Sequence, residues 1–162
     1  MTVSTVQDEQ AWMRQAIAVA TDSVNSGGGP FGALIVKDGR VVATGHNRVT
    51  ATNDPSAHAE VDAIRAACKE LNTFSLEGCT LITSCEPCPM CLSTALWARV
   101  DRLVFSADRH DAAAAGFDDR EFYDLFEKKP QGAWPMRIVH LDLPHRTEPF
   151  EAWNAKSDRV DY

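Results

Sequence analysis

Apolar residues recur at every third or fourth position near the start of the chain, beginning at about Gln10. This spacing places them on one side of a helix of about four turns. Glycines and a proline over residues 27–30 end the pattern, because both residue types interrupt helices. The sequence therefore predicts an amphipathic first helix, whose buried side comprises Met13, Ile17, Ala20 and Val24.

Two short apolar runs follow, over residues 33–36 and 40–43. Between them lie Asp38 and Gly39, a pair that readily adopts the positive φ angles of a tight hairpin turn. We therefore expect two antiparallel strands joined at this turn.

The rest of the chain alternates between helical and strand-like patterns after a polar loop over residues 46–56. Helices are predicted over residues 58–71, 87–97, 118–127 and 147–155, and strands over 80–83, 102–106 and 136–141. The strand, helix and strand between residues 80 and 106 predict a right-handed parallel crossover. Together these elements predict a three-layer α/β/α sandwich around a mixed sheet of about five strands.

The composition narrows the class of protein. A chain of 162 residues predicts a single domain, residues 1–162. The 16 basic and 23 acidic residues give a net charge of −7, which disfavours binding to nucleic acid. No apolar stretch approaches the length of a signal peptide core or a membrane span, so we expect a cytoplasmic protein that does not bind membranes.

The cysteines indicate a metal site. Cys85, Cys88 and Cys91 fall within seven positions, which suggests metal binding more than disulfides. Cys88 and Cys91 open one predicted helix and His58 opens another, and the positive end of a helix dipole favours thiolates. Two thiolates and one imidazole suit zinc.

Three protein ligands leave a fourth zinc position for water, whose pKa then falls from 15.7 to about 7. Glu60 lies two residues after His58, so its carboxylate is placed to move protons beside that water without becoming a ligand. This division of roles is what a hydrolytic deamination requires.

Other metal sites fit the same cysteines less well. With Cys85 as a fourth ligand, the zinc would be closed and purely structural, and the protein would be a non-catalytic interaction module. An iron–sulfur cluster is disfavoured, because no further cysteine follows Cys91 to complete a four-cysteine set.

The segments His58-Ala59-Glu60 and Pro87-Cys88-Pro89-Met90-Cys91 match the H-x-E and P-C-x-x-C signature of zinc nucleobase deaminases. On these motifs the chain resembles the cytidine deaminase-like superfamily and, within it, the bacterial guanine deaminases. The narrower resemblance rests on residues 29–33, 53–55, 84–91 and 115–119 and on the terminal Tyr162. It implies one zinc ion per subunit and deamination of guanine to xanthine and ammonia, in purine catabolism or salvage.

The resemblance also implies roles for individual residues. Asn47 and Asp119 match residues that contact the polar edge of the base, and guanine offers N–H donors to a carboxylate. Phe31 and Trp97 are candidates for stacking on the purine, although each is equally well read as a core aromatic. Ala59, between the metal ligand and the proton carrier, completes the expected contacts.

The end of the chain resembles a tail that closes an active site in a homodimer. The family implies that C-terminal segments, about residues 145–162, are exchanged between subunits and bring Tyr162 to a site. Ser93-Thr94 and residues 128–135 depart from the family pattern. The zinc motif does not determine which base is deaminated, so guanosine, cytosine, aminotriazines and tRNA adenosine remain alternative substrates. Of these, the net charge of −7 disfavours tRNA.

Overall fold

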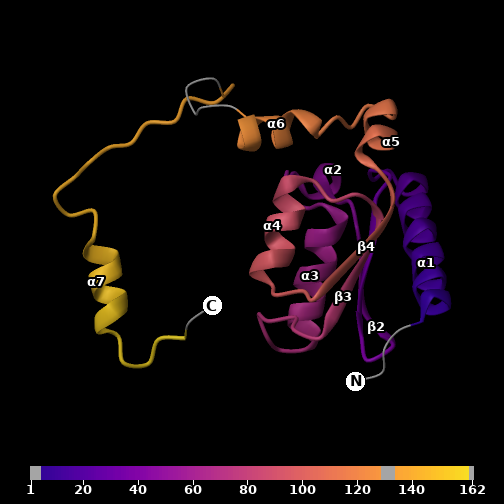
Figure 1. Cartoon of the computed structure of the whole chain (residues 1–162), viewed down its shortest axis with the longest axis horizontal. Helices are drawn as coiled ribbons and strands as arrows, with labels where there is room; N and C mark the ends of the chain where they lie inside the picture. Colours follow the sequence, from indigo (N-terminus) through magenta and orange to yellow (C-terminus); the bar gives the residue numbers. More distant parts are fainter. Residues whose placement is uncertain (1–4, 129–133, 161–162) are drawn as a thin grey trace. The chain divides into compact units, whose positions relative to one another are not determined.

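The computed structural model describes residues 5–128 and 134–160, which form two compact units, Met1–Tyr123 and Asp124–Tyr162 (Figure 1). The helices are α1 (Val6–Asn25), α2 (Val49–Thr52), α3 (Ala59–Glu70), α4 (Pro89–Trp97), α5 (Arg109–Ala114), α6 (Arg120–Lys128) and α7 (Glu148–Ala155). The strands are β1 (Gly32–Lys37), β2 (Arg40–His46), β3 (Cys79–Cys85) and β4 (Arg102–Ala107).

The four strands form one mixed sheet in the order β2-β1-β3-β4. β1 pairs antiparallel with β2 and β3, and β3 pairs parallel with β4 across the α4 connection. The hairpin turn has Asp38 at φ 50° and Gly39 at φ 76°, with Lys37 opposite Arg40. Both the predicted hairpin and the predicted parallel crossover are confirmed.

Helices cover both faces of the sheet, which confirms the three-layer α/β/α architecture. α1 packs on one face, and α3 and α4 pack on the other (Figure 1). On the α3 side, alanines Ala59, Ala63 and Ala67 are buried against the sheet. Gly45 in β2 allows this approach, because a Cβ there would lie 2.3 Å from the Ala59 carbonyl oxygen.

The buried side of α1 differs from the predicted stripe. Ile17 and Val24 are 44% and 50% exposed, whereas Ala16 is fully buried and Ala20 nearly so. The reason is the close packing of α1 on β1: a Cβ at Gly32 would lie 2.4 Å from the Ala16 carbonyl oxygen. Only a small side chain fits where α1 crosses Gly32, so Ala16 and Ala20 are buried there in place of Ile17. Met13 of the predicted stripe packs against the core.

The prediction of a fifth strand over residues 136–141 is wrong. This segment has no regular structure, and its side chains Met136, Val139 and Leu141 are exposed. Alternating hydrophobicity gives the side-chain pattern of a strand but does not supply a hydrogen-bonded neighbour, and residues 134–160 offer none. The short helices α2 and α5 were not predicted, whereas α7 falls close to its expected position.

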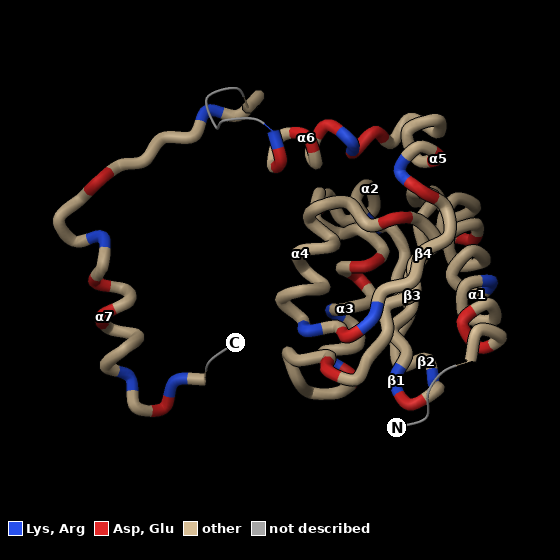
Figure 2. The backbone as a smooth tube through the Cα atoms, in the orientation of Figure 1, with Lys and Arg blue, Asp and Glu red and all other residues tan. Residues whose placement is uncertain are grey.

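No helix in residues 5–128 and 134–160 has both the length and the apolar character needed to cross a membrane. Acidic and basic positions are interspersed along α5 and α6 (Figure 2).

Candidate active site

The two helix starts that carry the predicted ligands meet beside the end of β3. His58 is the N-cap residue of α3, Cys88 is the N-cap residue of α4, and Cys91 lies in the first turn of α4. His58 Nδ1 lies 3.6 Å from Cys88 Sγ and 3.4 Å from Cys91 Sγ, and the two sulfur atoms are 3.6 Å apart. Within the described residues, these three form the one group able to hold a metal ion.

The spacing of these atoms fits zinc. Zinc–sulfur bonds of about 2.3 Å and a zinc–nitrogen bond of about 2.0 Å, at tetrahedral angles, place neighbouring ligand atoms about 3.5–3.8 Å apart. The separations between His58, Cys88 and Cys91 agree with this geometry to about 0.2 Å. Three protein ligands leave one tetrahedral position for another group.

The surroundings of Cys88 favour its thiolate. Hydrogen-bond contacts of Cys88 Sγ with Cys91 Sγ and with His58 lower the pKa of Cys88 to about 4, although burial opposes this change. The contact with Cys88 in turn raises the pKa of His58. A thiolate is the form of cysteine that binds metal, so this ligand is ready for metal binding near neutral pH.

Cys85 does not join the ligand group. Its thiol is buried and donates to the Asp108 carbonyl oxygen at 3.7 Å. Burial raises the pKa of Cys85 to about 11. The group of possible metal ligands among the described residues contains His58, Cys88 and Cys91 and leaves out Cys85, which does not support a closed structural zinc with Cys85 as fourth ligand.

Glu60 lies beside the ligands, in the first turn of α3, with only 5% of its surface exposed. Its Oε2 atom accepts from Cys91 Sγ at 3.4 Å, and its Oε1 atom lies 3.3 Å from Thr83 Oγ1. Burial raises the pKa of Glu60, which favours a carboxyl group able to take up and release a proton. This is the environment expected of a general acid and base.

Thr83 is a site residue that the sequence reasoning missed. Its hydroxyl lies 3.1 Å from the Cys85 carbonyl oxygen as well as 3.3 Å from Glu60, so its single proton serves one acceptor at a time. The same strand also carries the hydroxyls of Thr80 and Ser84, so no signal in the sequence singled out Thr83.

A cavity of about 510 Å³ opens onto this group. Six of the predicted site residues line it together: His58, Glu60, Cys88, Asn47, Phe31 and Asp119. Ala59 is fully buried at the start of α3 and is not among the residues that line the cavity. The structure does not bring Trp97 there: it ends α4 with 66% of its surface exposed. Tyr162 lies outside the described residues.

Asn47 and Asp119 present polar groups to the cavity. Asn47 Oδ1 accepts from the Val49 amide at 3.3 Å, and the backbone of Gly29 packs closely against the same side chain. Asp119 Oδ1 is buried without a hydrogen-bond partner among the described residues. A buried acceptor without a partner costs free energy, so a ligand N–H group would be favoured at this point.

Aromatic side chains form one wall of the cavity. Phe31 and Phe117 contact edge to face, with ring centroids 5.1 Å apart. Phe122, from the first turn of α6, lines the cavity as well. Neither Phe117 nor Phe122 was predicted, because each belongs to a segment whose position over the site depends on the tertiary fold.

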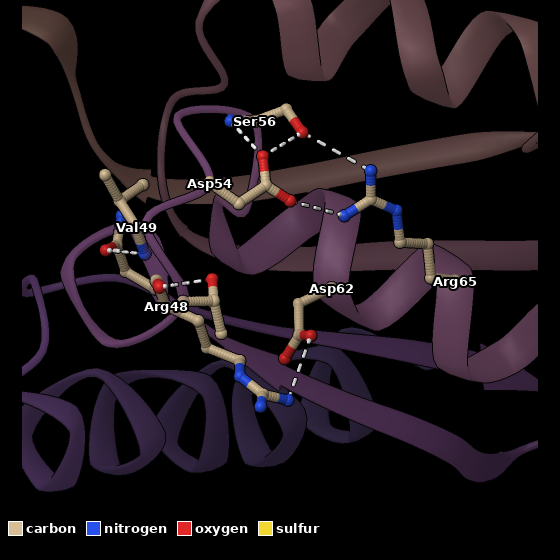
Figure 3. A network of polar contacts seen from close by, with 8 residues as sticks. Arg48, Val49, Asp54, Ser56, Asp62 and Arg65 are labelled. Atoms are coloured by element: carbon tan, nitrogen blue, oxygen red, sulfur yellow. Dashed lines mark hydrogen bonds and ion pairs between the residues drawn. The ribbon is translucent and has the colours of Figure 1, made fainter.

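A polar network holds the loop between Asn47 and His58 (Figure 3). Asp54 accepts from the Ser56 amide at 2.9 Å and from the Ser56 hydroxyl at 2.6 Å, and Arg65 of α3 reaches both side chains. The His58 amide donates to the Ser56 carbonyl oxygen at 2.8 Å. The loop that ends at the histidine ligand is therefore anchored to the helix that follows it.

Comparisons with known proteins agree with this site. Residues 6–107 match the model of the cytidine and deoxycytidylate deaminase zinc-binding region. The chain is 45% identical to a guanine deaminase of Bacillus subtilis over 156 residues, covering 96% of this chain and 99% of that protein. It is 40% identical to a tRNA-specific adenosine deaminase of Aquifex aeolicus, over 61% of this chain and 66% of that protein.

Two solved structures of guanine deaminases also match this chain. The structure of the Bacillus subtilis guanine deaminase matches with a TM-score of 0.91 and covers 94% of this chain and 98% of its own. A guanine deaminase structure from Nitrosomonas europaea, 33% identical, matches with a TM-score of 0.66 over 73% of this chain and 68% of its own.

Proposed function

Because this chain belongs to the cytidine and deoxycytidylate deaminase family of zinc-dependent enzymes, we propose that it hydrolyses guanine to xanthine and ammonia. The family and its zinc requirement were both predicted from the motifs, and both predictions are confirmed. The observation that carries the choice of guanine is the match to a guanine deaminase along nearly the whole of both chains.

The ligand set fits zinc, held by His58, Cys88 and Cys91. When bound, zinc lowers the pKa of a water molecule at its open position and so supplies a nucleophile near neutral pH. Glu60 provides the other half of the chemistry, because its buried carboxyl group lies against Cys91 at the same point of the cavity.

Glu60 carries protons in this proposal. It takes a proton from the attacking water and passes it to the ring nitrogen next to the carbon that bears the exocyclic amine, while the water oxygen bonds to that carbon. It then takes the remaining proton from this oxygen and gives it to the amine, so that the carbon–nitrogen bond breaks, ammonia leaves and the oxygen becomes the carbonyl of xanthine. The raised pKa of Glu60, caused by burial, suits a group that must be protonated and deprotonated in one cycle.

Recognition of the base falls to three residues that line the cavity. Asp119, whose Oδ1 atom has no partner among the described residues, accepts from guanine N–H groups. Asn47 contacts the polar edge of the ring, and Phe31 contributes an aromatic surface for stacking. Ala59 closes the space behind the metal ligand, and Trp97 is left out of these contacts.

We propose that residues 1–162 act as one catalytic domain in a homodimer whose C-terminal segments, about residues 145–162, are exchanged. Exposed apolar side chains over residues 134–160, among them Met136, Leu141 and Phe150, support this, because such surface favours burial against a partner. β4 is an edge strand of the sheet and carries an exposed Phe105. Light scattering on the purified protein tests the proposal, with twice 17.8 kDa expected.

A cytoplasmic location and a role in purine catabolism or salvage complete the proposal. A free base is a small substrate, so the net charge of −7 poses no barrier, whereas it disfavours a tRNA partner. Acidic and basic positions are intermixed along α5 and α6, so neither helix offers a run of basic residues for a phosphate backbone (Figure 2).

An ammonia-release assay tests the function. The zinc-loaded protein is given guanine, guanosine, cytosine, aminotriazines and adenosine-bearing tRNA at equal concentrations. We expect guanine to be deaminated with the highest kcat/KM. Faster release from another compound would contradict the choice of guanine, and release from none of them would contradict the deaminase function.

A further inference from the structure

Three side chains that the proposed chemistry does not use connect the metal-binding loop to the segment that carries Asp119. They are Glu86, Arg109 and Tyr123, from the loop before α4, the first residue of α5 and the first turns of α6. All three belong to the unit that contains the cavity.

Glu86 begins the connection. Its amide donates to the Ala107 carbonyl oxygen at 2.8 Å, which extends the parallel pairing of β3 and β4 by one residue. Its carboxylate accepts two hydrogen bonds from Arg109, from Nη2 at 2.6 Å and from the backbone amide at 3.0 Å. With both side chains partly buried, this two-point contact fixes the loop against α5.

Tyr123 completes the connection between the metal-binding loop and the segment that carries Asp119. The Arg109 guanidinium carbon lies 3.8 Å from the centre of the Tyr123 ring, a cation–π contact. The Tyr123 hydroxyl donates to the carbonyl oxygen of Pro87, the residue directly before the metal ligand Cys88. Tyr123 itself follows Asp119 by one helical turn, so its ring ties α6 to the metal-binding loop.

We propose that Glu86, Arg109 and Tyr123 are positioning residues that set the distance between the metal-binding loop and the Asp119 carboxylate. This inference rests on the proposed function, in which Asp119 holds the base while the metal site and Glu60 act on it. Small misplacements of reacting groups cost large factors in rate, so a fixed spacing between these two sides of the cavity favours turnover.

The first experiment is a double-mutant cycle with Tyr123→Phe and Asp119→Asn. Tyr123→Phe keeps the ring over Arg109 and removes only the hydrogen bond to Pro87. We expect one zinc per chain to be retained, kcat/KM for guanine to fall about tenfold and KM to rise. In the Asp119→Asn protein, the same change should lower kcat/KM less than threefold, because the carboxylate that it positions is already gone.

A matched pair of variants separates positioning from general stability. Arg109→Lys and Arg102→Lys each replace a guanidinium group that pairs with a glutamate, but Arg102 pairs with Glu9 at the opposite end of β4. We expect Arg109→Lys to lower kcat/KM about tenfold and Arg102→Lys to change it less than twofold. Melting temperatures are measured for both.

The outcomes are distinct. Equal losses from Tyr123→Phe in both backgrounds, loss of zinc from Tyr123→Phe, or equal effects of the two arginine variants would overturn the positioning role. The same double-mutant cycle is repeated in the Glu60→Gln protein, where calorimetry measures the affinity for guanine and no turnover is needed. An unmodified protein that neither binds nor deaminates guanine would instead contradict the proposed function.

Discussion

The carboxyl group of Glu60 combines burial with contacts on both oxygens. One oxygen faces Cys91 of the ligand group, and the other faces the hydroxyl of Thr83. Neither neighbour is a permanent positive charge, so burial dominates and raises the pKa of Glu60. A group in this position can exchange protons with both water and substrate.

Glu60→Gln should therefore abolish turnover and leave metal binding intact. Glutamine keeps the size of the side chain and one acceptor oxygen but cannot carry a proton. We expect kcat to fall by about 10²–10⁴-fold, the usual contribution of general acid–base catalysis. Ammonia release and zinc content are measured on the same sample, and activity within tenfold of the unmodified protein would rule out the assigned role.

Asp119→Asn should weaken recognition of guanine. The amide retains one acceptor but adds a donor that meets the N–H groups of the base, and a hydrogen bond to a charged group contributes about 1.5–3 kcal/mol. We expect kcat/KM to fall at least tenfold. Asp118→Asn is the control, because Asp118 pairs with Arg120; an equal loss from both variants would contradict a specific role for Asp119.

The ligands were predictable because their chemistry is local in sequence. A Cys-x-x-Cys pair at a helix start and a histidine two residues before a glutamate define the metal site without tertiary information. Thr83, Phe117 and Phe122 were not predictable in this way. Each is an ordinary residue type, and only the fold brings it to the cavity.

At the scale of elements, small residues decide how closely helices approach the sheet. Alanines of α1 and α3 lie against glycines of β1 and β2. The periodicity of apolar residues located both helices correctly. It placed Ile17 on the buried side of α1, whereas the structure buries Ala16. The orientation of a helix therefore depends on which strand residues it meets, which periodicity does not reveal.

Gly45→Ala should destabilise the protein. The new methyl group would lie 2.3 Å from both the Ala59 carbonyl oxygen and the Ala63 amide nitrogen, which are backbone atoms that cannot rotate away. Overpacking of this kind costs about 1–3 kcal/mol. Urea denaturation measures the loss, and an unchanged midpoint would show that α3 moves outward freely. Because His58 caps α3 and Glu60 lies in its first turn, we also expect lower activity.

At the scale of the whole molecule, the metal joins parts of the chain that are distant in sequence. His58 and Cys88 are 30 residues apart and belong to the starts of two helices. Removal of zinc with a chelator should therefore lower the melting temperature as well as abolish activity, because a ligand at 100 times its Kd adds about 2.7 kcal/mol of stability. Calorimetry with and without added zinc checks this. An unchanged melting temperature after verified metal loss would contradict the prediction.

Deletion of the residues after Arg159 should reduce guanine turnover without affecting zinc content. In the proposed dimer this tail brings Tyr162 to an active site, so its loss opens the cavity to water. We expect kcat/KM to fall about tenfold and the melting temperature to change little. Full activity in the shortened protein would show that the tail is not part of the site.

The wide separation of the ligands also bears on how the protein is made. β3 lies between the two helices in sequence and pairs with β1 at the centre of the sheet. A nascent chain that has emerged only as far as α3 holds the histidine but neither thiolate. Metal capture during biosynthesis must therefore wait until β3 has docked and α4 has formed, so a metallated molecule is one whose central topology is already native.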